Sequence, residues 1–261
     1  MSQAVYSDRQ VSIPVYERKY ADNTSTETLT IIVPVYNEEA NLARVEKELA
    51  TFVKEAKIET TILFINDGSI DASARMIGEI CLRNDHFRFL SFKKNVGLSA
   101  AIKAGIDHAR TSLVGYIDAD LQTSPADFHI LLAELGDNDL VTGVRRDRKD
   151  SFVKKMSSTI ANKIRRAFTH DGMEDTGCPL KIIRADAAKK IPMFNGLHRF
   201  LPAMILLQNG KVKQVPVKHF PRIAGKANFG LANRLLGPLS DCFAYLWMKK
   251  KYISYEIDKK G

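Results

Sequence analysis

Cysteine is scarce in this sequence, and the three that occur, Cys81, Cys178 and Cys242, lie far apart without a CxxC pair. This spacing argues against a disulfide framework and against a cysteine-bound zinc site, and it fits a reducing compartment. Long apolar runs are also missing, because no stretch reaches the roughly 18–20 apolar residues that span a bilayer. The polar N-terminus does not resemble a signal peptide, so we expect residues 1–28 to form a mobile tail.

The usual nucleotide-binding signatures are absent from the first half of the chain. It contains neither GxGxxG nor GxxxxGK(S/T), which excludes the common dinucleotide-binding and P-loop classes. What is present is an ordinary globular composition, 45% hydrophobic and 26% charged. A length of 261 residues fits one large α/β domain, with or without an appendage.

Charge is divided unevenly along the chain. Residues 1–140 carry 14 Lys and Arg against 21 Asp and Glu, whereas residues 141–261 carry 25 against 9. A basic surface attracts polyanions such as nucleic acid, anionic lipid or a phosphorylated substrate, and a solvated lysine-rich face is the plain alternative. No nucleic-acid recognition motif accompanies the basic half, so we expect no nucleic-acid partner.

Short apolar, β-branched runs alternate with helical patterns up to residue 143. Strands are predicted at 29–36, 60–65, 87–92, 112–117 and 139–143. Helices are predicted over 41–56 and 72–83, within 95–109 and from Ser124-Pro125, with Asn37 and Asp71 as caps of the first two. This alternation implies a mainly parallel sheet with helices on both faces, which we assign to residues 29–230.

Polar side chains follow the predicted strand ends. They are Asn37-Glu38, Asn66-Asp67-Gly68-Ser69, Asn95, and the pair Asp118 and Asp120. In open parallel sheets ligands bind beyond the carboxyl ends of the strands. We therefore expect these four segments to converge on one edge of the sheet and to form a ligand site.

The segment "YIDADLQTSP" places Asp118 and Asp120 two residues apart after an apolar run. Side chains at i and i+2 of an extended segment point to the same side, and buried acids are costly unless paired or metal-bound. Three interpretations are open: turn-capping acids, a general acid/base pair as in glycoside hydrolysis, or ligands of a divalent cation. With the Gln122 amide oxygen nearby, the carboxylates suit Mg²⁺ or Mn²⁺, which then favours a diphosphate-bearing donor.

Taken together, "TIIVPVYNEE", "NDGSIDAS", "NVGLSAAIKAGIDHA" and "YIDADLQTSP" resemble the family 2 glycosyltransferases with the GT-A fold, a Rossmann-like α/β architecture. "DTGCPLKIIRADA" and "HFPRIAGKANFG" are similar to one branch, the dolichol-phosphate mannosyltransferase-like and undecaprenyl-phosphate sugar transferases. The resemblance implies an inverting, metal-dependent enzyme that moves a sugar from a UDP- or GDP-sugar to a polyprenyl phosphate. Transfer to a saccharide or other hydroxyl is the alternative, and a binding module without turnover is a third possibility from another class.

The resemblance also implies roles on the donor side. Pro34, Tyr36 and Glu38 would line the nucleotide pocket, and Asp67 would bond the base or ribose. The remaining donor-side residues are Asn95 and Gly97 in the closing loop, Asp118 on the ribose or metal, and Asp120 and Gln122 on the metal. The family's DDGS motif begins here with Asn66 instead of an acid.

On the acceptor side, an attacking phosphate is already an anion and requires positioning and charge neutralisation rather than a base. Arginines supply both. The candidate basic residues are Arg145, Arg146, Arg222 and Lys226, of which the first and third match basic positions of the family. Asp175 matches a family acid near the acceptor and would be the base if the acceptor were an alcohol; a plain turn acid is the alternative.

The last segment, residues 231–261, predicts an amphipathic helix. Its apolar residues at near-helical spacing are Leu235, Leu236, Leu239, Phe243, Leu246 and Trp247, followed by Lys249, Lys250 and Lys251. Such a helix suits an anionic bilayer interface, and a helix packed on the domain is the alternative. We expect a peripheral protein on the cytoplasmic face of the membrane, held there by this helix or by a membrane-anchored partner.

Overall fold

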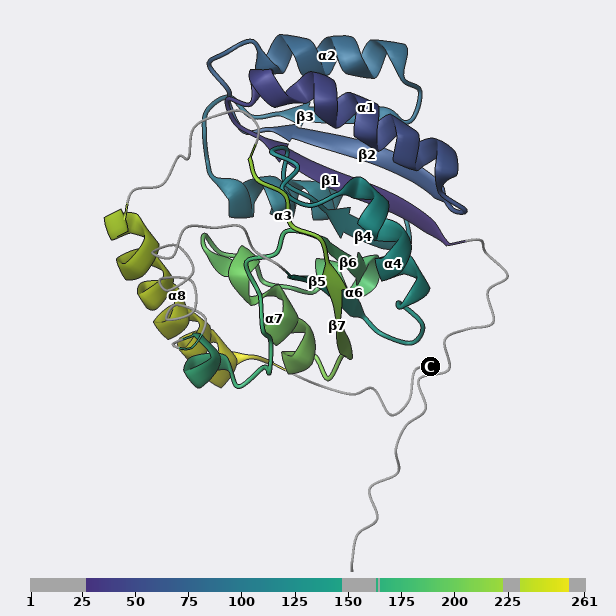
Figure 1. Cartoon of the computed structure of the whole chain (residues 1–261). Coiled ribbons are helices and arrows are strands. Elements are labelled where there is room, and N and C mark those ends of the chain that lie inside the picture. Colours follow the sequence, from purple (N-terminus) through teal and green to yellow (C-terminus); the bar gives the residue numbers. More distant parts are fainter. Residues whose placement is uncertain (1–26, 147–162, 164, 223–230, 254–261) are drawn as a thin grey trace, which may run out of the picture.

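The computed structural model describes residues 27–146, 163, 165–222 and 231–253, with backbone alone for 231–238 (Figure 1). Within these residues one seven-stranded sheet has the order β3-β2-β1-β4-β6-β5-β7. The strands are β1 (Thr28–Val35), β2 (Glu59–Asn66), β3 (Phe87–Ser91), β4 (Leu113–Tyr116), β5 (Leu140–Arg145), β6 (Lys181–Arg184) and β7 (Val212–Val217). Only β6 runs antiparallel to its neighbours, β4 and β5, so the mainly parallel sheet is confirmed.

Helices cover both faces of this sheet, as predicted. They are α1 (Glu39–Glu55), α2 (Ser73–Arg83), α3 (Leu98–His108), η1 (Pro125–Asp127), α4 (Phe128–Ala133), α6 (Ala185–Lys189), η2 (Leu197–Phe200), α7 (Leu201–Leu207) and α8 (Leu231–Lys251). Figure 1 shows α1 and α2 on one side of the sheet, with α8 far from them on the other.

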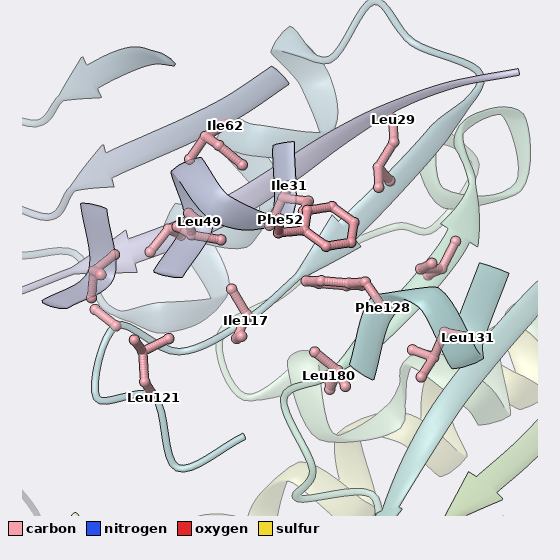
Figure 2. Close-up of a cluster of buried hydrophobic side chains, with 14 of the residues drawn as sticks. Leu29, Ile31, Leu49, Phe52, Ile62, Ile117, Leu121, Phe128, Leu131 and Leu180 are labelled. Carbon is pink, nitrogen blue, oxygen red and sulfur yellow. The ribbon is translucent and has the colours of Figure 1, made fainter. Parts of the chain in front are cut away.

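Each face has its own hydrophobic core. Alternate residues of β1, such as Ile31 and Val33, join the cluster beneath α1, whereas Ile32 between them joins the opposite cluster with α3, α7 and α8. In the first cluster the rings of Phe52 and Phe128 lie 5.6 Å apart and join α1 to α4 (Figure 2). Fully burying one such side chain contributes roughly 1.5–3 kcal/mol, so these clusters fix the sheet on which the site is built.

The predicted helix caps are wrong by one residue. Helix α1 begins at Glu39 after Glu38, while Asn37 adopts a left-handed φ of 54° and accepts a hydrogen bond from the Ile70 amide at 2.9 Å. Helix α2 follows Ala72, although Asp71 still accepts a hydrogen bond from the Ser73 amide at 2.9 Å. The reason is that the two loops serve each other's unpaired amides, which leaves these side chains just outside the cap positions.

Helix α8 has one side packed on the domain and one side that exposes apolar residues, while its contact with a membrane stays a prediction. Its inner side is packed on the domain, because Cys242 and Tyr245 are buried and the Tyr245 ring stacks on Phe200 at 5.4 Å. Its outer side exposes Phe243 and Trp247, which are 58% and 69% accessible. Among the described residues, no helix is both long and apolar enough to cross a membrane.

The predicted domain bounds can be compared with the structure only in part. The domain was predicted to start at residue 29, and β1 begins one residue earlier, at Thr28. Residues 1–26 of the predicted tail, Lys226, and residues 254–261 of the predicted C-terminal segment lie outside the described residues.

Candidate active site

The carboxyl ends of β1, β2 and β4 meet at one edge of the sheet, because β1 pairs with both of the others in parallel. Pro34 is half-buried near the end of β1 opposite Ile65, and Tyr36 follows directly after that strand. The two loops are joined where the Asn37 amide donates to the Ser69 hydroxyl at 3.0 Å. The structure therefore brings the first two predicted segments together.

Asp67 holds the predicted closing loop, which contains Asn95 and Gly97, in place through hydrogen bonds. One of its carboxylate oxygens accepts from the Val96 amide at 2.7 Å, and the other accepts from the Gly97 amide at 2.8 Å and the Asn95 side chain at 2.9 Å. At neighbouring Gly68, with a φ of 65°, a Cβ atom would lie 2.3 Å from the Lys94 carbonyl carbon. Only glycine fits this approach. The base or ribose contact of Asp67 stays a prediction, but its role in holding this loop is direct.

The amide of Asn66 explains the departure from the DDGS pattern. Its nitrogen donates to the Ser91 hydroxyl at 2.7 Å, and its oxygen accepts from the Ser69 amide at 3.1 Å. An ionised aspartate accepts hydrogen bonds but donates none, so it could not make the first of these contacts in the same form. Asn66 is buried and acts as a structural link between β2, β3 and the loop.

Asp118 and Asp120 lie at the end of β4, as predicted. The Tyr116 hydroxyl donates to Asp118 at 2.5 Å, while Asp120 accepts from the Gln122 amide at 3.1 Å and pairs with Arg222 at 2.7 Å. Burial raises the pKa of Asp118 to about 6, and the negative charge of Asp120 adds to this rise. Two like charges forced together in a buried place are relieved by a cation.

The loop that carries these acids is anchored in the hydrophobic core. Leu121, between Asp120 and Gln122, is buried in the cluster beneath α1 and has a left-handed φ of 47° (Figure 2). A non-glycine residue in this conformation is strained by roughly 1–2 kcal/mol, which burial of the leucine offsets. The buried leucine thereby fixes the backbone of the turn between Asp120 and Gln122.

The donor set fits a divalent cation that keeps much of its own shell. Asp118 and Asp120 offer hard oxygen ligands, while in the described part of the chain no group of three or more His, Cys, Asp or Glu side chains could hold a metal. Mg²⁺ commonly binds through one or two carboxylates and completes its shell with water and substrate phosphates. The Gln122 side-chain nitrogen donates to the Phe220 carbonyl at 3.4 Å, so its metal contact stays a prediction.

Two further candidate residues, the basic Arg145 and the acidic Asp175, form an ion pair with each other. Arg145 at the end of β5 grips Asp175 with two parallel hydrogen bonds, from Nε at 2.8 Å and from Nη2 at 2.9 Å. Burial opposes the charge of Arg145, but the Asp175 carboxylate outweighs it and raises the arginine pKa further. A carboxylate held in this way is a poor general base, which argues against the alcohol-acceptor role of Asp175.

The other basic candidates are placed differently. Arg222 lies against Asp120, and Glu38 is close enough that the positive charge of Arg222 opposes the rise in pKa that burial causes at Glu38. Arg146 instead points to the surface, where its exposed side chain faces Glu174 at 3.6 Å. The structure thus brings Arg222 to the acid pair and places Arg146 at the rim.

With this geometry established, comparison with known proteins identifies the family. Residues 30–192 match the model of Glycosyl transferase family 2. The chain belongs to glycosyltransferase family 2. It is 31% identical over 213 residues to the dodecaprenyl-phosphate galacturonate synthase of Rhizobium johnstonii, covering 78% of this chain but only 62% of that relative.

Solved structures agree with this family 2 fold. Glucosyl-3-phosphoglycerate synthase from Mycobacterium tuberculosis in complex with UDP has a TM-score of 0.66 at 16% identity, over 87% of this chain and 82% of that one. The same enzyme with Mn²⁺, UDP-glucose and phosphoglyceric acid has a TM-score of 0.66 at 14% identity, over 87% and 81%. At this identity the likeness shows the fold, and the predicted GT-A architecture is confirmed.

One buried residue of this family 2 domain received no role from its sequence pattern. Lys181 is 1% exposed on β6, and its ammonium donates to the carbonyl oxygens of Thr176, at 3.4 Å, and Cys178. The available signal was a single lysine inside the apolar run "PLKII". A lysine there is almost never fully buried unless it is paired.

Proposed function

We propose that this chain is an inverting glycosyltransferase that moves a sugar from a UDP- or GDP-sugar to a polyprenyl phosphate. The observation that supports this acceptor is the bidentate ion pair of Arg145 and Asp175. Asp175 is held by the arginine and is a poor base for a hydroxyl acceptor, whereas arginine is a suitable partner for a phosphate. The relative named dodecaprenyl-phosphate galacturonate synthase supports the same acceptor class. A phosphate acceptor needs no base, because it is already ionised at neutral pH.

The residues divide the work between donor and acceptor. Asp118 and Asp120 would hold Mg²⁺ or Mn²⁺, which offsets the charge that develops on a diphosphate leaving group. Tyr116, through its hydrogen bond of 2.5 Å, orients Asp118 for this purpose. Arg145 and Arg222, together with Lys226, would position the acceptor phosphate and neutralise its charge, a role that suits planar guanidinium groups.

We also infer that α8 holds the enzyme on the cytoplasmic face of an anionic membrane. The exposed residues Leu239, Phe243, Leu246 and Trp247 recur at helical spacing on its outer side. The lysine cluster Lys249–Lys251 follows directly in the last turn. Apolar residues beside lysines suit the headgroup boundary, where each lysine contributes about 1 kcal/mol.

The test of the enzymatic proposal is a donor panel of UDP- and GDP-sugars with Mg²⁺ or Mn²⁺, with and without undecaprenyl phosphate. UDP-galacturonate belongs in the panel because of the relative's name. A sugar-phospholipid product that depends on both cation and lipid is expected. Transfer only to saccharides or other hydroxyl compounds would overturn the lipid acceptor, and nucleotide binding without any turnover would leave a binding module.

Flotation with anionic vesicles tests the membrane inference. The wild type should float at low salt, and high salt should release it because salt screens the lysines. Replacing Lys249, Lys250 and Lys251 with Gln should weaken flotation in the same direction. A wild type that stays at the bottom of the gradient would show that α8 is only a packed helix.

A further inference from the structure

Lys181 is a buried charge for which the proposed mechanism has no use. It lies on β6, in register with Tyr116 of β4 on one side and Thr142 of β5 on the other. Tyr116 holds Asp118 on the donor side, and β5 ends in Arg145 on the acceptor side. Lys181 therefore sits in the strand that separates the two halves of the site (Figure 1).

The ammonium group of Lys181 is bound to the turn that carries Asp175. It donates to the carbonyls of Thr176 and Cys178, which flank Gly177. Moving a lysine out of water is costly without such partners, so this bond fixes the turn firmly. Burial lowers the pKa of Lys181, and the negative charge of Asp175 is among the groups that oppose this change.

The same turn packs directly on Arg145. A Cβ atom at Gly177 would lie 3.1 Å from the Arg145 Nη2 atom, so the guanidinium rests against the backbone of the turn. Asp175, at the start of the turn, also holds the arginine through two hydrogen bonds. A shift of this turn would move Arg145, because both contacts would move with it.

We propose that Lys181 is a positioning residue that sets the direction in which Arg145 presents its guanidinium to the acceptor. The inference rests on the proposed function and deepens it. Two of the five N–H donors of an arginine are used by Asp175, and the orientation of that pair decides where the others point. A misplacement of about 1 Å in a positioning group can cost about a hundredfold in rate.

The test compares Lys181→Met, which keeps much of the volume and removes the charge, with the wild type. Its kcat/KM for the acceptor should fall about 10- to 100-fold, whereas Mn²⁺-dependent UDP binding, measured by calorimetry, should stay within about twofold. Lys189→Met is the matched control, since Lys189 also donates to a backbone carbonyl, that of Ala109 at 2.9 Å. The control should leave both quantities unchanged.

A double-mutant cycle separates positioning from plain stabilisation. If Lys181 acts through Arg145, the double variant Lys181→Met with Arg145→Lys should be no worse than the more impaired single variant. Losses that multiply would overturn the proposal, as would equal loss of donor binding and acceptor turnover. The melting temperature of each variant is recorded so that kinetic constants refer to folded enzyme.

A second variant covers the case in which Lys181→Met does not fold. Gly177→Ala presses on Arg145 from the turn and should raise the acceptor KM while sparing UDP binding; an unchanged acceptor KM would contradict the proposal. The wild type alone tests the proposed function. If it uses a hydroxyl acceptor instead of the lipid phosphate, that function fails, and the cycle is measured on the hydroxyl acceptor to decide the inference separately.

Discussion

The proposed donor side of this site, around Asp67 and the acid pair, and the proposed acceptor side, around Arg145, are built in different ways. On the donor side, three parallel strands end together, and short loops fill the edge with backbone and side-chain hydrogen bonds such as those of Asp67. On the acceptor side, an antiparallel strand intervenes, and the site is assembled from ion pairs between distant residues such as Arg145 and Asp175. Hydrogen bonds between short loops therefore hold the donor-side residues in place, and ion pairs hold the acceptor-side residues in place.

The largest effect is expected at Asp120, which touches both sides. Asp120→Asn keeps the shape and removes the charge that would hold the cation, so turnover should fall about 100-fold or more. Metal-dependent binding of UDP should be lost in calorimetry. Asp127→Asn is the matched control, because Asp127 is also buried and accepts a backbone amide, that of Lys218 at 3.2 Å. Unchanged metal-dependent binding in Asp120→Asn would contradict the cation assignment.

Replacing Arg222 should weaken acceptor binding and strengthen Mn²⁺ binding. Arg222→Ala would remove the proposed charge-assisted contact with the acceptor phosphate, which should weaken acceptor affinity by about 1.5–3 kcal/mol, or roughly ten- to a hundredfold. It also frees Asp120 from its ion pair at 2.7 Å, so Mn²⁺ should bind the nucleotide-free protein more tightly. Acceptor kinetics and Mn²⁺ titration followed by electron paramagnetic resonance measure the two effects. Equal losses in donor and acceptor affinity would place Arg222 at the donor diphosphate instead.

The loop-built side can be tested without touching any charge. Gly68→Ala places a Cβ 2.3 Å from the Lys94 backbone, whereas Gly172, with a similar φ of 68°, has nothing within 4 Å of its Cβ position. Both variants place a Cβ atom on a backbone with left-handed φ and are strained by it. The difference between their free energies of unfolding therefore measures the clash at Gly68, about 1–3 kcal/mol by analogy with overpacked cores. Chemical denaturation should show this extra loss only in Gly68→Ala, together with weaker UDP binding. Equal destabilisation of the two variants would refute the close approach.

The smallest effect is a pH dependence of stability at His198, which links η2 to α3 through its hydrogen bond of 2.7 Å with Ser99. Burial lowers the pKa of His198 to about 3, below the 6.5 of an ordinary histidine. Between these values the unfolded chain binds one proton more than the folded chain. The contribution is therefore complete above pH 6.5 and declines as the pH falls, by about 1–2 kcal/mol at pH 5.

His198→Gln should remove this part of the pH dependence. Urea unfolding of the wild type and the variant at pH 7 and pH 5 gives the comparison, because the carboxylates titrate alike in both proteins. The wild type should lose more stability than the variant on acidification. Parallel losses would show that His198 is not held neutral by the fold.

The same contrast explains what could be predicted from the sequence. The strands up to residue 143 and the convergence of their polar ends follow from local patterns, because apolar runs and turn residues signal strand ends directly. Strand β6 and the ion-pair partners of Arg145 and Asp120 do not, since Arg145 pairs with Asp175 and Asp120 pairs with Arg222, residues that only tertiary folding brings together. The partners of Lys181 are close in the sequence, but no local pattern marks them. The shifted caps at Asn37 and Asp71 have the same cause, because each side chain accepts a hydrogen bond from a backbone amide of the other loop.

The most direct test of this division is Mn²⁺-dependent UDP binding, measured by calorimetry in Asp120→Asn and Arg145→Gln, with GDP beside it. The account predicts that Asp120→Asn loses the metal-dependent binding, while Arg145→Gln keeps its affinity within about threefold of the wild type, less than 1 kcal/mol. If both variants lost donor affinity equally, Arg145 would belong to the donor site, and the separation of the two sides would be wrong.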